Sequence, residues 1–165
     1  MNTEKYLEGI EQKLSRYFDI EKAYKYKNID FEMFAKSFVR NERYFASKKF
    51  TIYAYESNEN IFIKCISRLD EATLLQIKDH LKSATEDYVK PHSEHMSTII
   101  TGIVVVENGI EEHLKKMIQK YNYLRSFAFG FKGWVYIRLI VVDLKKGEVL
   151  TNRRGKEVKK FYEIS

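Results

Sequence analysis

The sequence predicts an α+β domain with a mixed central sheet and helices packed on it. The main observation is the apolar run Ile-Ile-Thr-Gly-Ile-Val-Val-Val at residues 99–106, which is rich in β-branched side chains. A strand with one wet face would alternate, so this run is expected to be buried on both faces. Helical apolar patterns precede and follow it, and alternating patterns typical of strands fill much of the remaining chain. The run therefore belongs at the centre of a sheet roofed by helices.

Length and composition favour a single globular domain over residues 1–165. The chain has one cysteine, Cys65, so no internal disulfide can form. No apolar signal core is visible, and no apolar run approaches the roughly 20 residues of a membrane helix. We therefore expect a cytoplasmic protein, of prokaryotic type, that does not bind a membrane.

The first part of the chain predicts one helix and three strands. A helix starts at a Thr3 cap and places Leu7, Ile10 and Leu14, and then residues 17–18, on one face. Residues 31–39 are ambiguous, because their phenylalanines have helical spacing while their aromatic content favours a strand, which we prefer. Alternation in residues 43–55 and 60–66, around a turn at 56–59, predicts a hairpin.

The rest of the chain predicts two helices and five strands. Asp70 caps a helix that runs to about Lys90, where Pro91 ends it. The buried strand follows, and then a helix over residues 110–121. Four further strands are expected at 127–131, 134–143, 148–151 and 157–163. The predicted order is α-β-β-β-α-β-α-β-β-β-β.

The leading α-β-β-β-α-β order resembles the core of the restriction-endonuclease-like family. The resemblance implies an acidic residue at the start of the second strand and an acid-x-Lys on the third, which bind a divalent metal and activate water. Lys64 stands on the predicted third strand, but Phe62 occupies the position of the acid. Asp30 and Glu32 fall on the predicted first strand, one strand too early. A degenerate or active nuclease is therefore an alternative function.

Three segments, residues 40–44, 95–102 and 126–134, are similar to those of a family of small uncharacterised bacterial and archaeal proteins. The similarity spans most of the chain. That family has no assigned activity, so the resemblance supplies no mechanism.

The segment after Pro91 contains a candidate metal site. His92, Glu94 and His95 are ligand types that could share a metal ion, and a metal-dependent hydrolase is the corresponding alternative function. Their spacing is not that of a zinc-protease motif. The structural alternative is a polar connection between a helix and the buried strand, with a histidine at the helix end.

Basic residues suggest an anion-binding surface. From Leu144 onward the chain carries seven basic and three acidic residues, which include Arg153 and Arg154. A second group could line an anion-binding cleft of its own: Arg40, Arg43, Lys132, Trp134 and Arg138. Two alternatives stand beside this hypothesis. The lysine excess can reflect composition alone, and Arg138 can form a structural ion pair with Glu32, Glu42 or Asp143.

We therefore expect a non-catalytic binding domain whose basic surface takes a polyanion such as nucleic acid. Residues 125–130 resemble an RNA-binding aromatic motif, although aromatics that alternate with small residues are more often core. A third class is a self-associating protein, in which the tyrosine-rich segment 44–55 forms a homodimer face. No motif assigns a cofactor or a catalytic residue.

Overall fold

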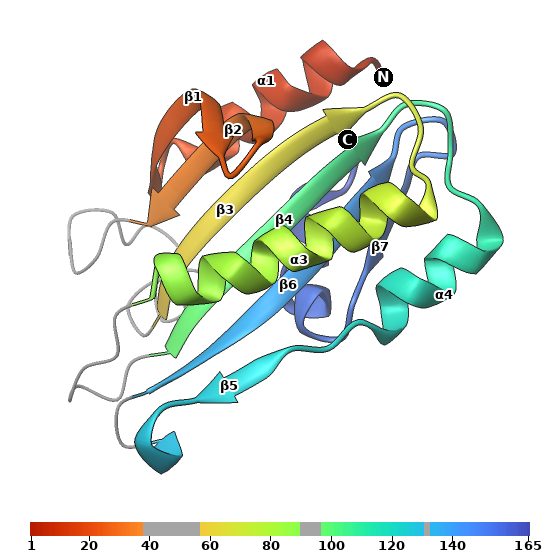
Figure 1. Ribbon diagram of the computed structural model, residues 1–165. Helices are drawn as coiled ribbons and strands as arrows, with labels where there is room; N and C mark the ends of the chain where they lie inside the picture. The colour runs from red at the N-terminus through yellow and green to blue at the C-terminus, as the bar shows by residue number, and fades with distance from the viewer. Residues whose placement is uncertain (38–56, 90–96, 131–132) are drawn as a thin grey trace.

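The computed structural model describes residues 1–37, 57–89, 97–130 and 133–165, which fold as helices on both faces of a mixed seven-stranded sheet (Figure 1). This confirms the predicted fold class. The strand order is β1-β2-β3-β4-β6-β5, with β7 also paired to β6. The strands have these bounds: β1 Phe18–Tyr26, β2 Ile29–Ser37, β3 Ser57–Ile66, β4 Ser97–Val106, β5 Leu124–Ser126, β6 Trp134–Asp143 and β7 Glu148–Thr151.

The β-branched run forms the interior of the sheet, as predicted. β4 lies between β3 and β6 and is parallel to both. Residues 99–106 are all buried, because helices cover both faces of the sheet. β1, β2 and β3 form an antiparallel meander on one side, while β5 and β7 are antiparallel to the two ends of β6 on the other.

The helices cover the two faces unequally. In the described residues they are α1 (Thr3–Leu14), α3 (Glu71–Asp87), α4 (Glu112–Lys120) and the short α5 (Lys159–Tyr162), with 3-10 turns η2 (Ala128–Gly130) and η3 (Arg154–Val158). α3 and α4 contribute to one apolar cluster, and α1 and α5 contribute to the other. None of the described helices has the length and apolarity needed to cross a membrane.

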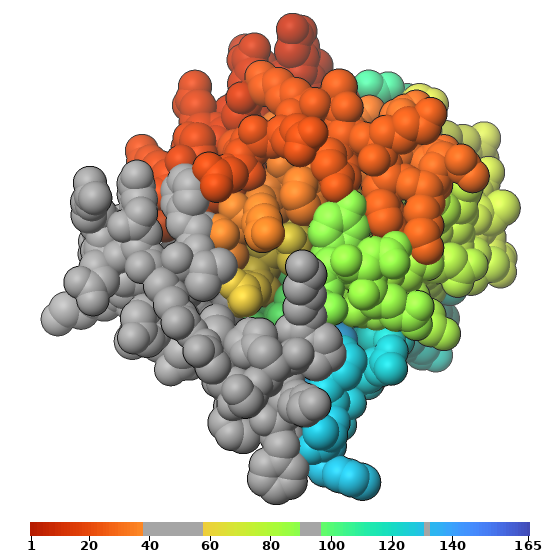
Figure 2. Space-filling view, turned by 60° about the vertical axis from the view of Figure 1, so that its left-hand side comes forward, coloured from red at the N-terminus to blue at the C-terminus, as the bar shows by residue number. Residues whose placement is uncertain are grey.

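β1 is a strand that the sequence analysis missed. Phe18 was expected near the end of the first helix, but it begins β1. Apolar and charged residues alternate at residues 18–21 and 24–26, but Lys22 and Ala23 interrupt the alternation, and only Phe18 and Tyr26 are buried. Tyr26 donates a 2.5 Å hydrogen bond to Asp87 at the end of α3, which joins the first hairpin to that helix. Figure 2 shows this end of α3 against the β1–β2 hairpin.

Other predicted elements near the N-terminus are close to the observed ones. Residues 29–37 form strand β2, so the preference for a strand at 31–39 is confirmed over its described part. Asn2, rather than Thr3, caps α1, since its side chain accepts from the backbone N–H of Lys5. Residues 57–59 belong to β3 and not to a turn. The strand expected at 43–55 lies outside the described residues.

Two predicted strands near the C-terminus are wrong. Residues 127–131 were expected to form a strand. In the described part of this segment the chain instead turns through η2, because Ala128, Phe129 and Gly130 all have positive φ. Residues 157–163 were expected to form a strand, but they form the end of η3 and then α5. The Tyr6 hydroxyl of α1 donates a 2.7 Å hydrogen bond to the carbonyl of Tyr162, which fixes α5 beneath α1.

Candidate functional site

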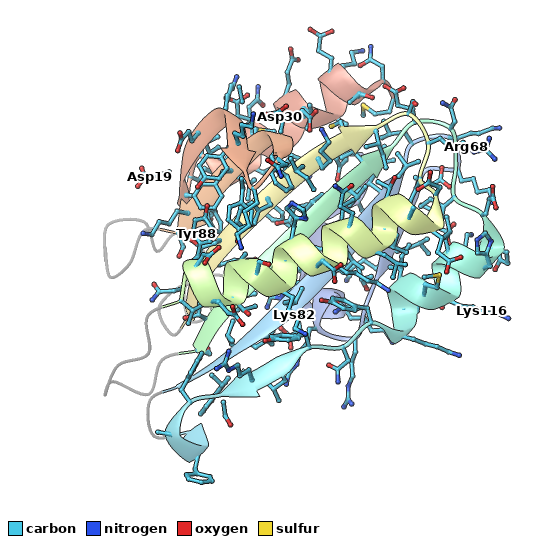
Figure 3. The ribbon with its side chains drawn as sticks, viewed as in Figure 1. Asp19, Asp30, Arg68, Lys82, Tyr88 and Lys116 are labelled. Carbon is cyan, nitrogen blue, oxygen red and sulfur yellow. The ribbon has the colours of Figure 1, made fainter. Side chains whose placement is uncertain are left out.

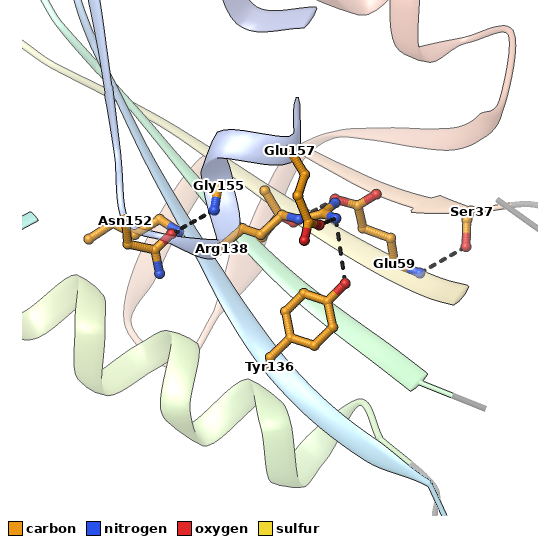
Figure 4. A network of polar contacts seen from close by, with 9 residues as sticks. Ser37, Glu59, Tyr136, Arg138, Asn152, Gly155 and Glu157 are labelled. Carbon is orange, nitrogen blue, oxygen red and sulfur yellow. Dashed lines mark hydrogen bonds and ion pairs between the residues drawn. The ribbon is translucent and has the colours of Figure 1, made fainter. Parts of the chain in front are cut away.

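A buried polar network centres on Arg138 in the middle of β6 (Figure 4). The side chain is completely buried. Its Nη2 lies 2.7 Å from Glu157 of η3, and its Nη1 lies 3.3 Å from Glu59 of β3. An ion pair was the structural alternative for this residue, but the observed partners are not those proposed.

The carboxylates proposed as partners of Arg138 are engaged elsewhere. Asp143 accepts hydrogen bonds from the backbone N–H groups of Ile110 and Lys146. Glu32 lies 3.6 Å from Lys64, and Glu42 lies outside the described residues. The observed partners face Arg138 because alternate residues of β6 point to the side of the sheet on which η3 lies.

Glu59 occupies a position where its charge is unfavourable. It is buried, and its carboxylate accepts a 2.5 Å hydrogen bond from Thr101. One guanidinium faces two carboxylates here, so ionisation of both leaves a surplus negative charge. Burial, with the charge of Glu157, raises the pKa of Glu59 to about 7, against the lowering effect of the Thr101 hydrogen bond.

Asn152 holds η3 against the sheet. Its Oδ1 accepts from the backbone N–H groups of Leu139 and Gly155, and its Nδ2 donates to the carbonyl of Ile137. Gly155 permits the close approach, since a Cβ at this position would lie 2.9 Å from the Cβ of Thr151. The amide therefore fixes the start of η3, and with it the side chains that η3 presents to solvent.

The outer side of η3 is basic. We call the side chains of Arg153, Arg154, Lys156 and Lys159 the η3 surface. Arg153 and Lys156 are exposed, and in the described residues no ion pair engages Arg153, Lys156 or Lys159. Glu148, the acidic neighbour on β7, lies 2.8 Å from Lys115 of α4.

Two cavities meet at Arg153. One has a volume of about 620 Å³ and is lined by residues that include Gln119, Arg153, Lys156 and Lys159. The other, of about 380 Å³, is lined by Asn122, Leu124, Arg153, Arg154 and Glu157. The η3 surface therefore lines two adjoining hollows rather than a convex face.

Apolar side chains adjoin the η3 surface. The guanidinium of Arg154 lies 4.6 Å from the ring centre of Tyr136, a cation–π distance. Leu124 stands opposite Tyr136 in the β5–β6 register, and Trp134 lies two residues before Tyr136 on the same face. Leu124 is 55% exposed and Trp134 is 41% exposed.

A second group of cations lies outside these two hollows. Arg68, Lys145 and Lys146 border a cavity of about 290 Å³ beyond the carboxyl ends of β3, β4 and β6. Figure 3 labels Arg68 at this end of the molecule. The Arg68 guanidinium lies 3.0 Å from the Glu111 carboxylate, so part of this charge is compensated.

Several predicted site residues lie outside the described residues. These are the metal candidates His92, Glu94 and His95, and the anion candidates Arg40, Arg43 and Lys132. Within residues 1–37, 57–89, 97–130 and 133–165, no three histidine, cysteine or acidic side chains gather as metal ligands do. The described candidates are Trp134, Arg138, Arg153 and Arg154, of which Arg138 is enclosed by the sheet.

The missed strand changes the count on which the nuclease alternative depends. Because β1 precedes them, Asp30 and Glu32 lie on the second strand. Glu32 lies 3.6 Å from Lys64 and accepts a 2.7 Å hydrogen bond from the backbone N–H of Cys65. The position two residues before Lys64 remains Phe62, which is buried in the core. This part of the site therefore lacks the second carboxylate that a metal pair of this kind needs.

A family model described as "Domain of unknown function (DUF8052)" matches residues 2–164. The chain belongs to this family. Searches of the curated proteins and of the solved structures found no match.

Proposed function

For this member of the DUF8052 family, we propose a non-catalytic binding function in which the η3 surface takes a polyanion, nucleic acid being the first candidate. The observation that carries the proposal is the pair of hollows that meet at Arg153. Glu148 lines one hollow and Glu157 the other, but among the described residues neither carboxylate forms an ion pair with Arg153, Lys156 or Lys159. Lysine and arginine side chains in such hollows can contact successive phosphate or sulfate groups.

The surroundings of the η3 surface support this reading. Glu157 is half exposed and paired with Arg138, and Glu148 is paired with Lys115, so each carboxylate that lines the hollows has a partner outside the η3 surface. The formal net charge of +6 adds a long-range attraction for anions. Asn152 and Gly155 anchor η3 to β6, so the cations stand on a fixed support.

Binding should depend on salt and on position in the structure. We expect a labelled single-stranded oligonucleotide to bind in about 50 mM salt and to bind much more weakly in about 200 mM salt. Four phosphate contacts predict a slope of roughly −3 in a plot of log affinity against log salt. Fluorescence anisotropy of the labelled oligonucleotide measures both quantities.

Charge-reversal variants locate the surface. Arg153→Glu with Lys156→Glu should lower the affinity by roughly tenfold or more, because attraction becomes repulsion at the centre of the site. Lys145→Glu with Lys146→Glu changes the net charge by the same amount at residues that line neither hollow, and should have a much smaller effect. Equal losses in the two variants, or no binding at low salt, would overturn the proposal.

A further inference from the structure

We infer that the polyanion is a single-stranded nucleic acid, one of whose bases stacks on Trp134. This inference rests on the proposed function and specifies its ligand. It comes from a second observation, the exposed indole and leucine that share a face of the sheet with the arginines of η3. A ligand that was bound through its phosphate groups alone would need neither the exposed Trp134 nor the exposed Leu124.

The position of Trp134 follows from strand geometry. Trp134 and Tyr136 are two residues apart on β6, so their side chains point to the same face and are separated by about 7 Å along the strand. Arg154 covers the ring of Tyr136 from above. A guanidinium that can hold a phosphate thus stands one strand repeat from an exposed aromatic ring, and a nucleotide offers both a phosphate and a base.

An exposed apolar side chain, Leu124, lies beside the arginines. Leu124 lines the same cavity as Arg153 and Arg154, and more than half of its surface is exposed to solvent. Ser126 stands opposite Trp134 in the β5–β6 register, and Gly130, which has no side chain, lies near the edge of the indole: an added Cβ there would be 3.8 Å from Cζ3. One base can therefore stack on Trp134 and a neighbouring base can contact Leu124, while the phosphate backbone of the strand runs along the η3 surface.

This arrangement favours a single strand over a duplex. The bases of a duplex are stacked on each other, so their faces are not available to a side chain on a protein surface. Base stacking on an aromatic residue combined with arginine contacts is the general mode of single-strand binding without sequence preference. A sulfated or phosphorylated polymer without bases would use the cations and leave Trp134 unused.

Trp134 is the only tryptophan of the chain, so its fluorescence reports on this position alone. The experiment titrates the full-length protein with oligo(U) of about 12 nucleotides, with a duplex of the same length and with inorganic polyphosphate. We expect oligo(U) to quench the emission strongly, and polyphosphate to bind with little quenching. Binding of the duplex and of polyphosphate is followed by their competition with labelled oligo(U).

Variants at position 134 separate stacking from charge. Trp134→Leu should lower the affinity for oligo(U) by about tenfold and leave that for polyphosphate unchanged, while Trp134→Phe should retain most of the oligo(U) affinity because it keeps an aromatic face. Thermal unfolding checks that each variant is folded.

The outcomes distinguish the two claims. If polyphosphate and oligo(U) bind equally and Trp134→Leu alters neither, or if the duplex quenches Trp134 as strongly as oligo(U), the single-strand inference is overturned while the polyanion function stands. If none of the three ligands binds at low salt, both fail.

Discussion

Arg138 and Glu157 form a 2.7 Å ion pair between the middle of β6 and η3, and the arginine side chain is completely buried. The pair joins an interior strand to the segment that carries the exposed cations. A second carboxylate, that of Glu59, lies on the other amino group of the same guanidinium. The same network therefore holds η3, where binding is proposed, against the sheet.

The first prediction concerns the buried guanidinium. Arg138→Leu should lower the free energy of unfolding by about 3–5 kcal/mol, because it leaves Glu59 buried without its positive partner. Urea unfolding at about pH 8.5, above the pKa of about 7 of the Glu59 carboxyl, measures the loss. The double variant Arg138→Leu/Glu59→Gln removes the unpaired charge and should recover part of the stability; a double variant as unstable as the single one would contradict this account.

The second prediction concerns pH. The ordinary pKa of the Glu59 carboxyl is 4.5 and burial raises it to about 7 in the folded protein. Between these values the folded state holds a proton that the unfolded chain has released, so the contribution of Glu59 is fully present below about pH 4.5 and is lost as the pH rises through about 7. The loss amounts to about 3 kcal/mol.

Glu59→Gln isolates this contribution. Other groups also titrate between about pH 5 and pH 8, so the quantity to compare is the difference in unfolding free energy between wild type and variant at several pH values. The unfolding free energy of the wild type minus that of the variant should fall steadily as the pH rises. Parallel pH profiles for the two proteins would show that Glu59 does not carry the effect.

The third prediction concerns the amide of Asn152. Asn152→Ala removes three hydrogen bonds and leaves the N–H of Leu139 and the carbonyl of Ile137 without the amide as partner. We expect a loss of about 3 kcal/mol in the free energy of unfolding. Asn122→Ala, at an exposed residue, is the control and should change it by less than about 0.5 kcal/mol. Similar small values for both would argue against the anchoring role.

The fourth prediction concerns Gly155. A methyl group at this position would lie 2.9 Å from the Cβ of Thr151 and 3.2 Å from the carbonyl oxygen of Leu139, so Gly155→Ala should destabilise the protein by about 1–3 kcal/mol. Gly9→Ala is the matched control, since Gly9 lies inside α1 with no atom near its added Cβ. That control should stabilise the protein by roughly 0.5–1 kcal/mol. Calorimetry of both variants tests the contrast.

The sequence predicted the fold where burial leaves a pattern. β4 was predicted because both of its faces are buried, so its apolar run is continuous. β1 was missed because residues 17–18 were assigned to the first helix, and because Lys22 and Ala23 interrupt the alternation of residues 18–21 with that of residues 24–26. Apolar patterning in a sequence reflects the burial of side chains and not the hydrogen bonding of the backbone. An edge strand such as β1 buries few side chains, so its pattern is weak.

The site was predictable only in part, because its contacts are not local. Arg153 and Arg154 were predicted from charge alone. Lys156 and Lys159 were counted in the same basic C-terminal segment but were not named as site residues. Glu59 lies 79 residues from Arg138 in the sequence, and only the sheet brings the two together. A buried arginine indicates that partners exist, but its position in the sequence does not say which carboxylates they are.

The border of the sheet beyond β6 has a further consequence for solubility. β5 pairs with residues 134–136 of β6, and β7 pairs with residues 140–143. Between them, the backbone groups of Ile137 and Leu139 form hydrogen bonds with the carbonyl of Tyr123 and with the backbone and side chain of Asn152. The outermost run of backbone on this side is therefore no longer than the four residues of β7. Four residues are too few for stable pairing with a strand of a second molecule. We therefore expect this edge of the sheet to resist edge-to-edge aggregation even in concentrated solution.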